Sequence, residues 1–167
     1  MASTKRIIEI VGQIKEKTAS SDPFEICKQL GINIKFHNLG SIKAYCFCQS
    51  RIKNIVINEN ADDPTAKILC AHELGHALLH EQILKNVHVH RSTLFDETTP
   101  TEYEANLFAA ELLIADDMLF EKSGKSYMEI AKELCVPEAL VDFKCRIMKH
   151  KGYNIDAPSL FGSDFLK

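Results

Sequence analysis

Long apolar runs, a strong charge of one sign and paired cysteines are all missing from this sequence of 167 residues. No segment approaches the roughly 18 apolar residues that a membrane-spanning helix needs. The net charge of −3 gives no general electrostatic reason to bind nucleic acid or an anionic membrane. The stretch 5–10 carries charged residues too early for a secretory signal peptide. We therefore expect a cytoplasmic protein with no membrane partner.

The six cysteines are scattered and include no C-x-x-C pair, the spacing typical of zinc and redox sites. In a reducing compartment we expect free thiols that mostly fill space. Cys46 and Cys48 alternate as strand neighbours do, so their sulfur atoms would share one face of a strand. Two thiols alone make an incomplete structural zinc site, so a metal or redox role for this pair is the less favoured alternative.

Composition and periodicity indicate one α+β domain. The hydrophobic share of 46% and the charged share of 26% are ordinary for a globular chain, and the length suits one sizeable core. The pattern predicts a small, mostly antiparallel sheet packed on helices. The expected helices are 3–18, 23–30, about 64–84, 100–114, 126–134 and 137–150, and the expected strands are 32–37, 45–49 and 54–58.

The stretch His72-Glu73-Leu74-Gly75-His76 is the most informative part of the chain. It reads H-E-x-x-H inside a segment with helical periodicity, which begins at the acids and proline of 62–64. Residues four apart share one face of a helix, so His72 and His76 can offer two nitrogens to one metal ion. Glu73 is then placed to act on a metal-bound water, as the general base does in zinc hydrolases.

A catalytic zinc needs a third protein ligand, and the sequence offers it on a later helix. The metzincin pattern is excluded because its required positions are occupied by Leu79 and Gln82. In the predicted helix 100–114, Glu102 would bind the metal, and Asn106 lies four residues later, where it could support a ligand histidine. Glu104 points about 200° away from Glu102, so we expect a solvated acid at the helix start. Glu111 is expected to be a surface or structural acid.

These two segments, His72–His80 and Glu102–Leu113, resemble the ImmA/IrrE family of metallo-endopeptidases. The family pattern is a helix with H-E-x-x-H, followed by a helix reading roughly E-x-x-A-N-x-F-A-x-x-L-L. The resemblance is good over residues 40–120 and loose elsewhere. It departs at Ile114-Ala115, where many relatives have Met-Pro, but this concerns the end of the helix and not the site.

The resemblance implies a zincin-like metallopeptidase core that binds one Zn²⁺ ion. His72, His76 and Glu102 would be the zinc ligands, and Glu73 would be the catalytic acid/base. We expect the chain to divide into three parts: the peptidase core in 1–122, a helix-turn-helix-like helical pair in 123–150, and a tail in 151–167.

The resemblance also implies a substrate. Stand-alone ImmA-type proteins are encoded by prophages and mobile elements, and they cleave a helix-turn-helix repressor. A chain of this length resembles that type, so the expected partner is such a repressor. The alternative is a non-catalytic regulator that uses the zinc fold to bind and sequester the repressor.

Three further residues, Tyr45, His88 and His90, are candidates for supporting roles, whereas His80 is not. His80 lies two turns beyond His72 and is rotated by about 80°, so we expect a partly exposed helix residue and not a ligand. His88 and His90 fall in a loop between the ligand helices, where they could stabilise an oxyanion or contact substrate. Tyr45 begins the strand 45–49, which could accept an extended substrate as an added strand or could simply pack in the sheet.

The segment 126–142 resembles half of a DNA-binding helix-turn-helix. A DNA reader carries basic and amide side chains at the front of its second helix. Here that helix starts with acidic residues, Glu138 and Asp142, and its positive residues come late: Lys144, Arg146, Lys149 and His150. We therefore favour a packing or docking role, with DNA binding as the alternative.

Overall fold

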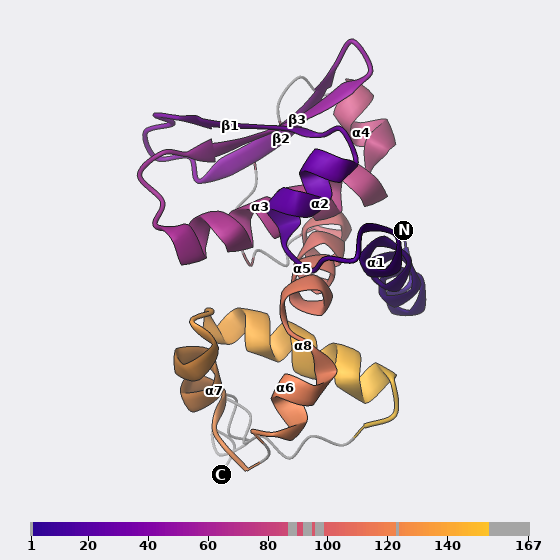
Figure 1. Ribbon diagram of the computed structural model, residues 1–167, viewed down its shortest axis with the longest axis vertical. Helices are drawn as coiled ribbons and strands as arrows, with labels where there is room; N and C mark the ends of the chain where they lie inside the picture. Colours follow the sequence, from indigo (N-terminus) through magenta and orange to yellow (C-terminus); the bar gives the residue numbers. More distant parts are fainter. Residues whose placement is uncertain (1, 87–89, 92–94, 96–98, 123, 154–167) are drawn as a thin grey trace.

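The computed structural model describes residues 2–86, 90–91, 95, 99–122 and 124–153, and it has the α+β architecture predicted from the sequence (Figure 1). The elements, in chain order, are α1 (Thr4–Thr18), α2 (Pro23–Gln29), β1 (Asn33–His37), β2 (Ala44–Gln49), β3 (Ile52–Asn58), α3 (Asp63–Leu79), α4 (Glu81–Asn86), β4 (His90–Arg91), α5 (Pro100–Leu113), α6 (Asp116–Phe120), α7 (Tyr127–Leu134) and α8 (Glu138–His150).

Polar caps define where the principal helices begin. The side chains of Ser3, Asp22, Asp62, Thr99 and Ser126 each accept a backbone N–H in the first turn of the helix that follows. In α2, α3 and α5 a proline occupies the first turn, where its missing N–H costs nothing. These short signals explain why the predicted helix starts agree with the structure within about a residue.

The sheet has the order β1-β3-β2-β4. β1 runs parallel to β3, whereas β2 is antiparallel to both β3 and β4, so the mostly antiparallel prediction is confirmed. The β2–β3 hairpin turns through Ser50 and Arg51, which have φ values of 51° and 66°. Positive φ at both positions matches the twist of the two strands. Strand β3 therefore begins at Ile52, two residues before the predicted start of this strand at 54.

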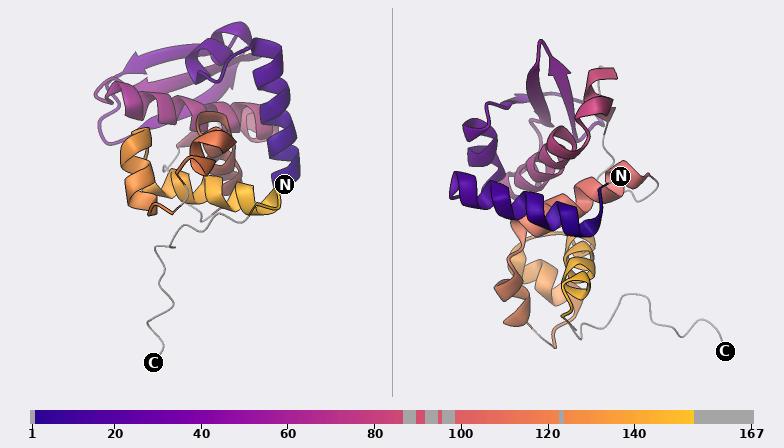
Figure 2. Two further views of the ribbon diagram at one scale, coloured as in Figure 1. Left: turned by 60° about the horizontal axis from the view of Figure 1, so that its bottom comes forward. Right: turned by 90° about the vertical axis from the view of Figure 1, so that its right-hand side faces the viewer.

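The helices stack in layers beneath the sheet. Figures 1 and 2 show α3 under the sheet, α5 crossing beneath α3, and α6 to α8 on the far side of α5. One cluster of buried apolar side chains runs through these layers, from Ile7 of α1 through Leu74 of α3 and Phe108 of α5 to Met148 of α8. It includes residues on both sides of the boundary at 122 proposed from the sequence. The two helices that carry the predicted metal ligands, α3 and α5, thus lie at the centre of the core.

The helix that carries the motif ends earlier than expected. The sequence predicted a helix to about residue 84, but α3 ends at Leu79. His80, with φ −119° and ψ 34°, leaves the helical conformation before α4 begins. The break changes the direction of the chain at His80 and turns its side chain inward, where it is 8% exposed.

A buried group of charges joins the C-terminal helices to α5. Lys144 of α8 is 1% exposed and forms an ion pair with Glu111 and one with Asp116. Lys151 reaches the same two acids at 2.7 and 2.8 Å. Glu111, which was expected to be a surface or structural acid, is therefore structural.

Within the described ranges, no helix combines the length and the apolar character that crossing a membrane requires.

Candidate metal centre

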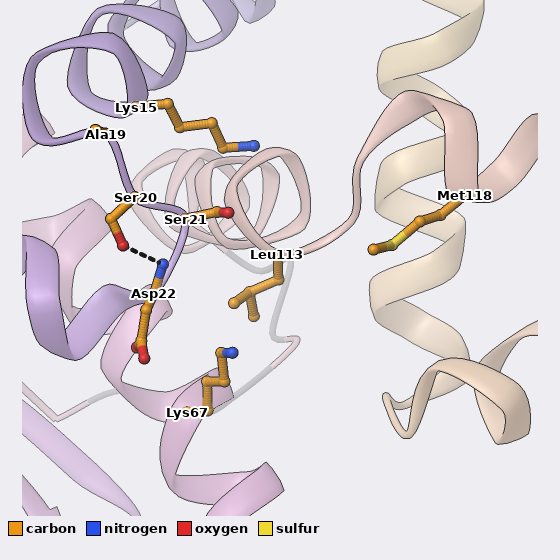
Figure 3. A pocket seen from close by; sticks show the side chains of 8 residues that line it. All are labelled: Lys15, Ala19, Ser20, Ser21, Asp22, Lys67, Leu113 and Met118. Carbon is orange, nitrogen blue, oxygen red and sulfur yellow. Dashed lines mark hydrogen bonds between the residues drawn. The ribbon is translucent and has the colours of Figure 1, made fainter.

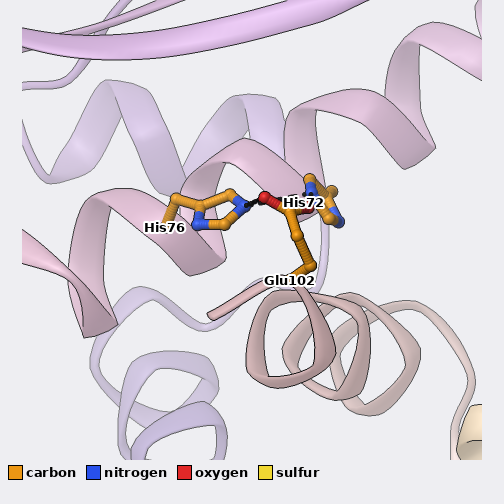
Figure 4. A group of neighbouring side chains, drawn as sticks. All are labelled: His72, His76 and Glu102. Atoms are coloured by element: carbon orange, nitrogen blue, oxygen red, sulfur yellow. Dashed lines mark hydrogen bonds and ion pairs between the residues drawn. The ribbon is translucent and has the colours of Figure 1, made fainter. Parts of the chain in front are cut away.

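His72, His76 and Glu102 meet where α3 and α5 cross (Figure 4). His72 Nε2 lies 3.1 Å from His76 Nε2 and 3.2 Å from Glu102 Oε2. His76 Nε2 lies 3.3 Å from Glu102 Oε1. Both histidines are fully buried and Glu102 is 6% exposed. The structure thus brings together the three residues that the sequence singled out as metal ligands.

The helix packing allows this approach because α3 has a glycine at the crossing. A β-carbon on Gly75 would lie 3.2 Å from the Cα of Ala105 and 3.2 Å from the side chain of Phe108. Any larger residue would push the helices apart. Glu102 therefore reaches the two histidines from a helix whose backbone lies unusually close to their own.

Glu102 is held in the charged form. Burial alone would raise its pKa, but the adjacent imidazoles of His72 and His76 lower the pKa of Glu102 to about 2. A carboxylate that is ionised at neutral pH is a suitable metal ligand.

The donor set fits zinc. Ligand atoms about 2.0–2.1 Å from a tetrahedral zinc ion stand roughly 3.4 Å apart, and the separations of 3.1, 3.2 and 3.3 Å lie close to that edge. Two imidazoles and one carboxylate are also a usual ligand set for catalytic zinc, with one position left for the reactants. These residues could hold a zinc ion without rearrangement of the helices.

Glu73, the next residue after the first histidine, is fully buried under strand β2. The thiol of Cys46 on that strand forms a hydrogen bond with Glu73. Burial, followed by the charge and the hydrogen bond of Glu73, raises the pKa of Cys46 well above its ordinary value. The middle of β2 therefore lies directly against the acid that the sequence assigned to catalysis.

Comparison with known proteins identifies the family of this chain. Residues 27–146 match the family model described as the IrrE N-terminal-like domain, Peptidase M78. The chain belongs to the Peptidase M78 family. A protein named "Uncharacterized immunity region protein 2" from Bacillus phage phi105 is 33% identical over 137 residues, which cover 80% of this chain and 85% of the relative. "Metallopeptidase ImmA" from Bacillus subtilis (strain 168) is 28% identical over 146 residues, which cover 85% of each protein. The resemblance found in the sequence is confirmed.

Two residues of this Peptidase M78 chain correct our expectations. His80 was expected to be partly exposed and Glu104 to be solvated, yet they are 8% and 3% exposed. His80 Nδ1 lies 3.0 Å from His76 Nδ1, and His80 Nε2 lies 3.0 Å from Glu104 Oε2. The spacing of four residues from His76 to His80 was the signal available in the sequence. It was missed because the position was projected along a straight helix, whereas α3 ends there.

The remaining candidates lie as follows. Asn106 is fully buried on α5, one turn after Glu102, and its support of a ligand histidine stays a prediction. Tyr45 packs its ring on Phe47, with ring centroids 6.0 Å apart, and alternation places both on the face of β2 opposite Cys46. His88 lies outside the described residues. The backbone of His90 is described as part of β4, where it pairs with Cys46, but its side chain is outside the described part.

A cavity of about 650 Å³ lies away from the metal centre of this Peptidase M78 domain (Figure 3). Lys15, Asp22 and Lys67 contribute its charges. Lys15 also donates to the backbone carbonyl of Glu111 at 2.8 Å, so one of the two cations already has a structural partner. None of His72, His76 and Glu102 lines this cavity.

Proposed function

We propose that this protein is a zinc-dependent endopeptidase that cleaves a helix-turn-helix repressor of a prophage or mobile element in the cytoplasm. The observation that carries the proposal is the buried group of His72, His76 and Glu102, whose ligand atoms all lie within 4.8 Å of one another. Membership in a peptidase family supports peptide-bond hydrolysis as the reaction.

His72, His76 and Glu102 would hold the zinc ion. Bound there, zinc supplies Lewis-acid polarisation of the scissile carbonyl and lowers the pKa of the attacking water. Glu73 acts as general base and takes the proton of that water at its carboxylate. It then delivers the proton to the leaving amine as general acid. Burial of Glu73 excludes bulk water that would compete for this proton.

Strand β2 is the proposed site of substrate alignment. On its outer edge, Tyr45 and Cys46 pair with β4, and among the described residues no strand pairs with Phe47, Cys48 and Gln49 on that side. An extended peptide added there would lie next to Cys46, whose thiol contacts Glu73. Backbone pairing would thereby bring a peptide bond toward the catalytic acid.

The repressor as substrate rests on the relatives. The phage phi105 protein is named for an immunity region, and the Bacillus subtilis relative is named a metallopeptidase. A metallopeptidase that cleaves a phage repressor would account for both names. The fragment masses from a cleavage reaction would identify the bond that is cut.

A paired experiment on purified protein tests the proposal. Bound metal is quantified first, and the wild type and Glu73→Gln are then incubated with a candidate helix-turn-helix repressor chosen from the neighbouring genes. We expect one zinc per chain in both proteins and fragments from the wild type alone. Full cleavage by Glu73→Gln would reject the role of Glu73, and absence of metal after reconstitution would reject the site.

The same experiment separates the alternatives. Zinc binding and repressor binding without cleavage would indicate a sequestering regulator. DNA binding by α8 finds little support, because Lys144 is buried in ion pairs and Arg146 pairs with Asp142 at 2.6 Å. A DNA affinity that falls steeply with salt would be needed to revive that alternative.

A further inference from the structure

A line of buried polar contacts leads away from the metal centre on the side opposite to Glu102. It starts at His76 Nδ1, which lies 3.0 Å from His80 Nδ1. It continues from His80 Nε2 to Glu104 Oε2, also at 3.0 Å. Glu104 Oε1 accepts the backbone N–H of Ala2 at 2.8 Å. The three side chains are at most 8% exposed, so the contacts are largely shielded from water.

The chemistry of the end groups fixes the direction of these hydrogen bonds. A carboxylate can only accept, so His80 must donate to Glu104 from Nε2. A neutral imidazole that donates from Nε2 has no proton on Nδ1, so Nδ1 of His80 would accept from Nδ1–H of His76. This leaves Nε2 of His76 without a proton. That nitrogen is the one that lies 3.1 Å from His72 Nε2 within the metal centre.

The two ligand histidines differ in this respect. The Nδ1 atom of His72 is buried and makes no hydrogen bond with any described residue. His76 instead has a defined partner whose own partner is a carboxylate. Outer partners of this kind orient a ligand imidazole and increase its basicity, and their loss typically weakens metal binding by about 10–100-fold.

We propose that His80 and Glu104 are positioning residues that hold His76 in the tautomer and orientation required to bind zinc. The inference rests on the zinc site of the proposed function. It adds two residues that neither touch the metal nor belong to the H-E-x-x-H motif. Their effect passes through His76 alone.

We call the contacts from His76 through His80 to Glu104 the relay. Three variants test the relay by zinc affinity, which is measured in competition with a chromophoric chelator and normalised to the folded fraction. His80→Phe fills similar space without hydrogen bonds and should weaken zinc binding by about 10–100-fold. His80→Gln should restore much of the affinity, because its amide can accept from His76 and donate to Glu104. Glu104→Gln can donate to His80, which would reverse the direction of the hydrogen bonds, and should weaken binding.

Glu111→Gln is the matched control. Glu111 is a buried acid on the same helix, but its partners are Lys144 and Lys151. This variant should lower the melting temperature and leave the zinc affinity of the folded protein unchanged. If His80 and Glu104 had a purely structural role, their variants would behave like Glu111→Gln and lose stability without losing zinc affinity. If they position His76, their variants should lose zinc affinity as well.

A spectroscopic readout completes the test. In the zinc-loaded wild type, a long-range ¹H–¹⁵N NMR spectrum should show His80 protonated at Nε2 and not at Nδ1. The opposite tautomer, or zinc affinities of His80→Phe and Glu104→Gln equal to that of the wild type, would overturn the relay. Failure of the wild type itself to bind zinc would instead overturn the proposed function, and the relay with it.

Discussion

Gly75 of α3 and Phe108 of α5 stand so close that a β-carbon on the glycine would lie 3.2 Å from both the Cβ and a ring carbon of the phenylalanine. Both histidines of the candidate metal centre are within three residues of Gly75, and Glu102 is on the helix that carries Phe108. The distance between the helices at this point therefore sets the distance between the two histidines and Glu102.

Gly75→Ala should weaken zinc binding and lower stability. The contacted atoms belong to backbone and to the base of a side chain, so the helices must separate by a few tenths of an ångström. Overpacking of this kind costs about 1–3 kcal/mol, which equals or exceeds the gain of about 1 kcal/mol from replacing a helical glycine. Gly12→Ala in α1 is the control, since its β-carbon meets nothing within 4 Å and should stabilise the protein. Urea unfolding and chelator competition measure both effects, and unchanged zinc affinity in Gly75→Ala would contradict the prediction.

Cys46 should resist alkylation in the folded protein. Its pKa is raised by burial and by the adjacent Glu73, and the thiolate is the reactive form. Cys135 is exposed and should react with iodoacetamide well before Cys46. Peptide mass spectrometry over a time course at pH 8 gives the order, with urea-unfolded protein as the reference. Equal rates at the two positions in folded protein would show that Cys46 is not shielded.

Lys144→Met should destabilise the protein without affecting the metal centre. Removing one partner of a buried ion pair costs roughly 3–5 kcal/mol, and the lower end applies here because Lys151 still contacts Glu111 and Asp116. Lys149→Met, at an exposed position of the same helix, should change stability by no more than about 0.5 kcal/mol. Urea unfolding compares the two variants, and equal stabilities would mean that the buried pairs contribute nothing net.

The contribution of Asp116 to the free energy of unfolding should decrease at acidic pH. Burial opposes its ionisation, but hydrogen bonds from Lys144 and Lys151 lower its pKa below the ordinary value of 3.8. A group with a lowered folded pKa stabilises the protein above its unfolded pKa, and this contribution is lost as pH falls through the folded value. The difference in unfolding free energy between the wild type and Asp116→Asn should therefore be constant from pH 5 to 7 and shrink below pH 4. A difference that grows on acidification would have the wrong sign.

Zinc should raise the melting temperature in a concentration-dependent way. A ligand that binds only the folded state adds about 2.7 kcal/mol at a free concentration 100 times its Kd. Glu73→Gln should show the same shift, because Glu73 is not one of the three proposed ligands. His76→Gln should show a much smaller one. A shift of the same size in His76→Gln would place the zinc elsewhere on the protein.

The three proposed metal ligands could be brought together from the sequence because their signals are local. The spacing of His72 and His76 on the capped helix α3 places them on one face, and Glu102 follows the capping residue of α5. His80 and Glu104 could not be placed in this way. Their burial depends on where α3 ends and on the N-terminal segment that covers Glu104, through a hydrogen bond between residues 102 positions apart.

Helix α5 shows the same limit for charged side chains. A run with several acids ordinarily indicates a solvated face. In this fold α5 is surrounded by other elements, and Glu102, Glu104 and Glu111 are all buried. The lysines that pair with Glu111 lie 33 and 40 residues further along the chain. Local periodicity holds no information about partners at that distance.

The position of the donors on two helices gives the ion a mechanical role. His72 and Glu102 are 30 residues apart in sequence, so zinc would close a chain loop of that length, as a disulfide does. All six cysteines of the protein are free thiols. The ion would thus act as a reversible cross-link between α3 and α5, one that a chelator opens and that a reducing compartment leaves intact.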